Sequence, residues 1–291
     1  MHKKKKRFLI AVIFLIGFVY LWSRSGIAQW YVASADLARE ERDYTRAMQQ
    51  LNRAIELQPK NPELLASRGR LQLDIIIAQK SSDFESCIAD FTQAIELAPE
   101  PFGYRYLNYR SEAYQHWANS LGDGPDRRSK FELSISDLQM VLEQFEPASN
   151  SLQHATALNS ISYARALANV DIAQALLDID EALEILEIST RAQQISAAAS
   201  QTYRSAWLDT RGYLRYRAGL YKQAKDDMEE AIRIIELQSE ATYGFPGVYG
   251  EGISVMYFHR GKIYEVLNFE NLAKVDLQWA SELGYPGNGI L

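Results

Sequence analysis

The stretch SAWLDTRGYLRYRAGLYKQAKDDMEEAIRIIE, residues 205–236, decides the fold. It reads as two amphipathic helices joined by a tight turn. Leu208, Gly212 and Arg215 share one face of the first predicted helix. Gly219 predicts the turn, because glycine tolerates left-handed backbone angles. The second helix is expected to pack through a face of small and large residues, namely Tyr221, Ala224, Met228 and Ala231.

This order of large and small residues resembles the tetratricopeptide repeat (TPR). Weaker or stronger versions of it recur along the chain, at about 28–61, 62–101, 104–147, 151–189, 205–236 and 254–285. The resemblance implies an all-α fold, an α-α superhelix formed as a TPR solenoid of about six helix pairs. The last small position of each unit recurs every 40 to 49 residues, whereas a standard TPR has about 34. Some units are therefore lengthened, and a HEAT or armadillo solenoid is the alternative architecture.

The N-terminal region, residues 1–27, differs from the rest. A basic run, Lys3 to Arg7, precedes an uninterrupted apolar segment from Phe8 to Trp22. As a helix this segment spans about 22 Å, short for a bilayer but usable as a single-pass anchor. The basic flank would keep the N-terminus cytoplasmic and place residues 28–291 on the extracytoplasmic side. A cleaved signal peptide is the alternative, since Gly26 and Ala28 suit a cleavage site, and it predicts a secreted or periplasmic domain.

Composition excludes several classes of function. The chain has 291 residues, of which 47% are hydrophobic and 23% charged, as expected for a folded protein. Its net charge of −6 becomes −12 without the first 28 residues, which carry six basic residues and no acidic ones. A domain this acidic does not favour nucleic-acid binding. Cys87 is the only cysteine, so no internal disulfide can form, and its repeat position predicts a small packing residue.

The sequence predicts no catalytic residue, no metal site and no cofactor. Its four histidines are scattered, and the HExxH, GxSxG and P-loop motifs are absent. Acidic residues are expected on outer, solvated helix faces. Two stretches rich in turn-forming residues, 120–130 and 237–252, are predicted to be a surface loop and a linker.

Partner binding is the function that the TPR resemblance implies. In TPR proteins the first helix of each pair lines a concave groove, and the matching residues here are Arg70, Arg105, Asn108, Tyr109, Glu112, Asp209, Tyr213, Tyr216 and Arg217. The Lys/Asn/Lys/Arg set that clamps a peptide carboxylate in some TPR domains is not matched. We therefore expect a membrane-anchored, non-enzymatic scaffold for an unknown protein or extended peptide, of unknown oligomeric state. The alternatives are a self-associating structural protein, and a ligand-binding or enzymatic protein that uses the two inserted segments.

Overall fold

The computed structural model describes residues 24–99, 103–122, 124–145, 151–243 and 252–285. These residues form 12 helices and no strand. The first helix covers residues 24–40. It is followed by α2 (Tyr44–Leu57), α3 (Pro62–Gln79), α4 (Glu85–Leu97), α5 (Tyr104–Ser120), α6 (Pro125–Glu143), α7 (Leu152–Ala168), α8 (Ile172–Arg191), α9 (Ala197–Arg217), α10 (Tyr221–Tyr243), α11 (Gly252–Val266) and α12 (Glu270–Glu282).

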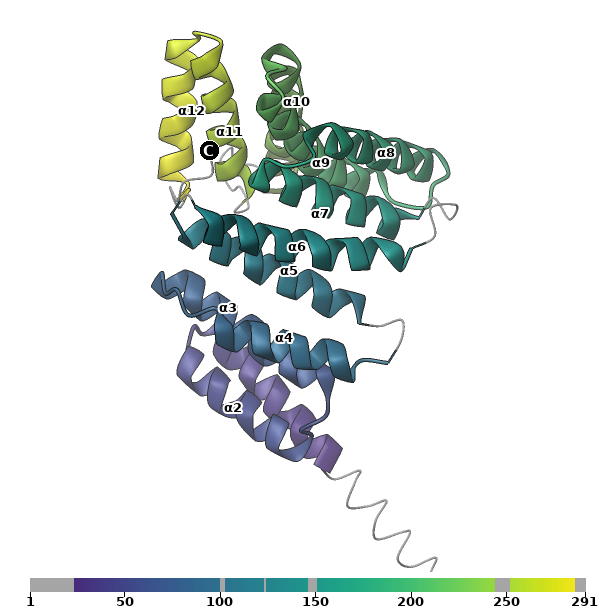
Figure 1. Cartoon of the computed structure of the whole chain (residues 1–291), viewed down its shortest axis with the longest axis vertical. Helices are drawn as coiled ribbons and strands as arrows, with labels where there is room; N and C mark the ends of the chain where they lie inside the picture. The colour runs from purple at the N-terminus through teal and green to yellow at the C-terminus, as the bar shows by residue number, and fades with distance from the viewer. Residues whose placement is uncertain (1–23, 100–102, 123, 146–150, 244–251, 286–291) are drawn as a thin grey trace, which may run out of the picture. The chain divides into compact units, whose positions relative to one another are not determined.

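Consecutive helices pack in pairs, as expected for a helical repeat protein. α3 packs on α4, α7 on α8, α9 on α10, and α11 on α12 (Figure 1). The second helix of one pair also contacts the first helix of the next, as α8 does with α9 and α10 with α11. The chain divides into two compact units, one up to His116 and one from Trp117, with the division inside α5.

Small residues allow the two helices of a pair to approach closely. A Cβ atom added at Gly69 would lie 2.7 Å from the Phe91 ring, and one at Gly212 would lie 2.9 Å from the end of Met228. Ala224 and Ala231, on the predicted packed face of α10, are fully buried. Gly219 has φ +76° and makes the turn between α9 and α10, which confirms its predicted role.

Both stretches predicted as loops are shorter than expected. α6 begins at Pro125, so the second half of 120–130 is helical, because proline is favoured in the first helical turn. α10 continues to Tyr243, so the first half of 237–252 is also helical. Those residues include neither glycine nor proline, and nothing in them stops the helix. α9 begins at Ala197, so the Ala-, Ser- and Gln-rich segment before residue 205 lengthens the first helix of the fifth pair, as its composition leads us to expect.

The predicted membrane segment, Phe8 to Trp22, lies outside the described residues. Among the helices that are described, none combines the length and the apolar character needed to cross a bilayer.

Candidate functional site

An ion pair between the two helices of a pair recurs along the chain. An arginine of the first helix contacts a buried aspartate of the second in four of the helix pairs: Arg68–Asp90, Arg165–Asp178, Arg211–Asp227 and Arg260–Asp276. Each of these aspartates is at most 9% exposed. The expectation that acidic residues lie on outer faces was therefore wrong for them. A carboxylate can be buried there because a guanidinium pairs with it.

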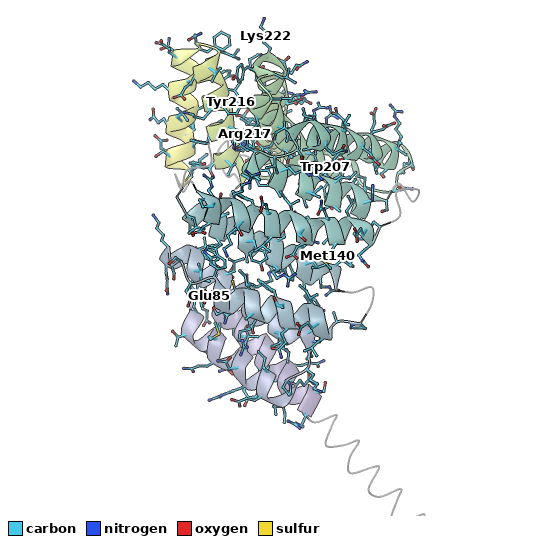
Figure 2. The ribbon with its side chains drawn as sticks, in the orientation of Figure 1. Glu85, Met140, Trp207, Tyr216, Arg217 and Lys222 are labelled. Atoms are coloured by element: carbon cyan, nitrogen blue, oxygen red, sulfur yellow. The ribbon has the colours of Figure 1, made fainter. Side chains whose placement is uncertain are left out.

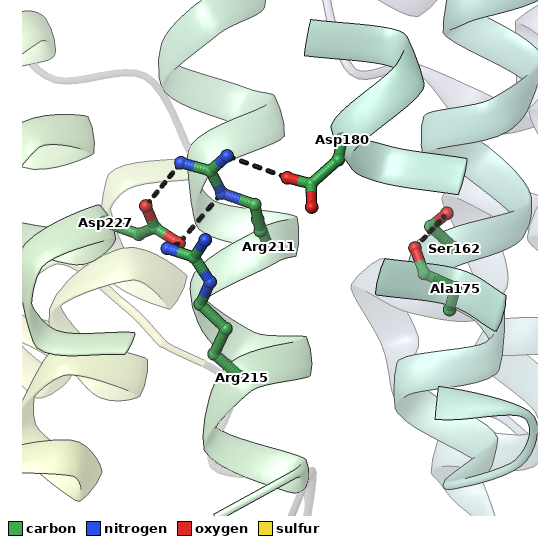
Figure 3. A network of polar contacts seen from close by, with 6 residues as sticks. All are labelled: Ser162, Ala175, Asp180, Arg211, Arg215 and Asp227. Atoms are coloured by element: carbon green, nitrogen blue, oxygen red, sulfur yellow. Dashed lines mark hydrogen bonds and ion pairs between the residues drawn. The ribbon is translucent and has the colours of Figure 1, made fainter. Parts of the chain in front are cut away.

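The most extensive of these contacts holds α9 between α8 and α10 (Figure 3). Arg211 donates two hydrogen bonds to Asp227, of 3.1 and 2.8 Å, and a third of 2.8 Å to Asp180 on α8. Arg215 donates to the same Asp227 carboxylate at 2.6 Å. Burial opposes the charge of Arg211, but its hydrogen bonds to Asp227 and Asp180 leave its pKa raised. Contacts to two neighbouring helices, α8 and α10, thus fix the position of α9.

Four predicted site residues lie on α9, and the structure divides them by exposure. Asp209 and Tyr213 are buried, 8% and 1% exposed. Tyr216 and Arg217, in the last turn of α9, are only partly buried (Figure 2). Tyr216 stacks on Tyr213, with ring centroids 6.3 Å apart. Only the second pair of residues keeps surface that a partner could contact.

A histidine that the sequence did not single out covers the buried pair. His259 of α11 stacks on Tyr213, with ring centroids 4.3 Å apart and planes 8° from parallel. Its Nδ1 atom lies 2.9 Å from an Asp209 carboxylate oxygen. Burial raises the pKa of Tyr213, so its hydroxyl stays protonated at neutral pH. Asp209 and Tyr213 therefore join α9 to α11.

The other five predicted residues lie in the first unit. Arg70 and Arg105 are exposed, as is Glu112, whereas Asn108 and Tyr109 are partly buried. The Arg70 guanidinium lies 4.8 Å from the centre of the Tyr109 ring, a cation–π contact between α3 and α5. Arg105 pairs with Glu63 of α3 at 2.6 Å. The structure thus brings together Arg70 and Tyr109, and gives Arg105 a separate partner.

No described part of the site resembles a metal or redox centre. The described residues include no group of three or more His, Cys, Asp and Glu side chains placed to hold a metal ion. Cys87 is 0% exposed, and its thiol donates to the Phe84 carbonyl oxygen at 3.1 Å. Burial raises the pKa of this thiol to about 12. Cys87 is a packing residue, as predicted from its position.

Comparisons with known proteins agree with this architecture. Residues 28–61 match the family model described as "Tetratricopeptide repeat", the same residues as the first predicted repeat. A tetratricopeptide repeat protein from Parabacteroides merdae has a similar structure, with 16% identity, a TM-score of 0.52, and coverage of 91% of this chain and 96% of that one. PilF from Pseudomonas aeruginosa gives 11% identity, a TM-score of 0.50, and coverage of 91% and 95%. No curated protein sequence matches. The chain has a TPR-type helical repeat fold.

Proposed function

We propose that this chain is a non-enzymatic interaction scaffold that binds a protein or extended peptide through the first helices of its repeats. The observation that carries the proposal is the repeat fold together with the arginine and aromatic side chains on those helices. Repeat arrays of this kind present extended surfaces for binding rather than enclosed reaction sites. Arginine and tyrosine are well suited as anchors, since they combine contact area with polar ends.

The Arg70–Tyr109 contact supports this proposal in the first unit. Arg70 is exposed, yet its guanidinium is held over the Tyr109 ring and lies 3.5 Å from the tyrosine hydroxyl. A side chain held in this way loses less conformational freedom when a partner binds. Arg105, one turn before Tyr109, adds a second exposed cation, and solvent weakens its pairing with Glu63 because both side chains are exposed. A partner segment with acidic side chains would suit these two arginines.

A capture experiment tests the binding role. The whole chain is immobilised, exposed to extract from its own cells, and compared with the double variant Arg70→Ala/Arg105→Ala. We expect a discrete protein that the wild type retains and the variant loses. The matched control is Arg46→Ala/Arg191→Ala, which removes two exposed arginines (side chains 47% and 75% exposed) from second helices. Equal retention by both double variants would contradict the proposal.

The proposal includes membrane anchoring through residues 8–22, with the repeats on the extracytoplasmic side. It rests on the basic run followed by the apolar segment. A phosphatase fused after residue 291, active only outside the cytoplasm, should show activity, and deleting Phe8 to Trp22 should abolish it. The N-terminal sequence of the mature protein separates an anchor from a cleaved signal peptide. Activity of the fusion after the deletion would refute the proposed orientation.

A further inference from the structure

A cavity of about 360 Å³ lies where α6, α7 and α9 meet in the second unit. Three arginines line it, Arg127 and Arg128 from the start of α6 and Arg217 from the end of α9. Its apolar wall includes Phe131, Leu167 and Val170. None of the described lining residues is acidic. Three guanidinium groups around one cavity are notable in a domain whose net charge is strongly negative.

Two of the guanidinium groups are held in place by aromatic rings. Arg217 lies over Tyr213, 5.5 Å from its ring centre, and its Nε donates to the Ala166 carbonyl oxygen at 3.2 Å. No described carboxylate pairs with the terminal nitrogens of Arg217, which leaves them available to a ligand. Arg127 lies 5.6 Å from the centre of the Phe131 ring. A ligand would therefore meet the terminal donors of Arg217 in a position that is already set.

The start of α6 adds to the positive potential. Gly124 precedes the helix and has no side chain to accept from the first-turn N–H groups. The helix dipole is positive at this end. Arg128 is tied to Glu132 at 3.0 Å, but both side chains are largely exposed, so solvent weakens that pairing. The charge of Arg128 therefore still contributes to the cavity.

We propose that this cavity binds a compact oxyanion, a carboxylate or a phosphate, carried on an apolar stem. The planar guanidinium fork matches the geometry of both anions and pairs with them through two hydrogen bonds. Phe131, Leu167 and Val170 provide the surface for the stem. The inference rests on the proposed function, since it names the group on the bound protein that the second unit recognises.

Small probes test the cavity without any partner. The whole chain is titrated calorimetrically with benzoate, phenyl phosphate and neutral benzyl alcohol, which share an aromatic stem. We expect at least one of the two anions to bind, and benzyl alcohol to bind at least about tenfold more weakly (about 1.4 kcal/mol), because it cannot accept charge-assisted hydrogen bonds as an anion does. The tighter of the two anions identifies the source as a carboxylate or a phosphate.

Substitutions place the binding in this cavity. Arg217→Gln should weaken the binding of the tighter-binding anion about tenfold. Arg128→Gln, at an exposed position that does not risk the fold, should weaken it about threefold. The matched control is Arg233→Gln, which removes one positive charge from an exposed side chain of α10 outside the cavity, and it should change nothing.

The outcomes separate this inference from the proposed function. Two results would overturn the cavity as an oxyanion site. One is that the anions bind no better than benzyl alcohol, and the other is that they bind both cavity variants as tightly as they bind the wild type. If the probes bind but Arg217→Gln retains the captured partner in full, the cavity is not the recognition site for that partner. If the probes bind and no partner is captured, the scaffold proposal fails and the oxyanion site stands.

Discussion

The ion-pair network around Asp227 gives a quantitative test of what holds the second unit together. The perturbation is Asp227→Asn, which keeps the size of the side chain and removes its charge. The carboxylate side chain is 6% exposed and accepts three hydrogen bonds from Arg211 and Arg215. The amide cannot match these bonds, because it offers one acceptor oxygen and a donor that faces other donors.

The size of the effect follows from which charges stay unpaired. Arg211 keeps Asp180, whereas Arg215 loses the one carboxylate that pairs with it among the described residues. Removing one partner of a buried ion pair costs about 3–5 kcal/mol. The two arginine side chains are 20% and 21% exposed, and water offsets part of the loss. We therefore expect the lower end of that range, about 3 kcal/mol.

Urea unfolding followed by circular dichroism measures this free-energy change, and hydrogen exchange locates it. The matched control is Asp180→Asn, whose side chain is 53% exposed and contacts the same Arg211. We expect it to cost less than about 1 kcal/mol. Faster exchange in Asp227→Asn should be concentrated in α9 and α10. A cost below about 1 kcal/mol, or equal costs for the two variants, would refute the view that the buried carboxylate holds these helices together.

Three further predictions concern packing, reactivity and pH. Gly69→Ala should destabilise by about 1–3 kcal/mol in urea unfolding, because the three nearest atoms all belong to the rigid Phe91 ring. Gly212→Ala should cost less, because the one atom within 3 Å is the flexible end of Met228, with the Ala224 carbonyl oxygen farther away at 3.3 Å; equal losses would contradict this. Cys87 should react with a thiol reagent at pH 8 only as fast as the protein opens, because its thiol is buried with a pKa raised to about 12; rapid labelling of native protein would contradict its burial. Burial lowers the pKa of His116 below its usual 6.5, with Glu112 opposing the shift. As pH falls, the histidine is therefore protonated in the unfolded chain before it is protonated in the folded chain. The free energy of unfolding should then fall below about pH 6.5, by at most about 1.4 kcal/mol per pH unit. His116→Gln should flatten that dependence in unfolding measured at pH 5.5 and 7.5, and an unchanged slope would show that other groups cause it.

Much of the fold could be predicted from residue order alone. A small residue is required wherever two helices of a pair approach closely, so Gly212, Ala224 and Ala231 indicated both the pairing and the packed faces. The turn at Gly219 followed from its backbone freedom. Helix ends were harder to place. Turn-forming residues near 120–130 suggested a loop, but Pro125 is also a favourable first residue of a helix, and the helix formed.

The buried aspartates show what a single-helix pattern cannot reveal. Asp227 lies beside Met228 of the packed face, and neighbouring acids on the same helix are solvated, so its position alone does not indicate burial. Its partner Arg211 is 16 residues away on another helix. A sequence signal does exist. An aspartate precedes the large packing residue in five of the six repeats, at Asp90, Asp137, Asp178, Asp227 and Asp276. The recurrence of aspartate at one repeat position indicates a role in tertiary packing, whereas the residue type alone indicates a solvated surface.

The same reasoning changes which predicted site residues can meet a partner. Tyr213 and Asp209 were chosen by position on one helix, but α11 packs across α9 and His259 covers them. Under the proposed function the contribution of Tyr213 is indirect, because its ring supports the guanidinium of Arg217, which lines the cavity. In the first unit the Tyr109 ring likewise supports the guanidinium of Arg70 through a cation–π contact. In each unit, therefore, an aromatic ring lies against an arginine, and under the proposed function such positioned arginines would favour partners that carry planar or tetrahedral oxyanions.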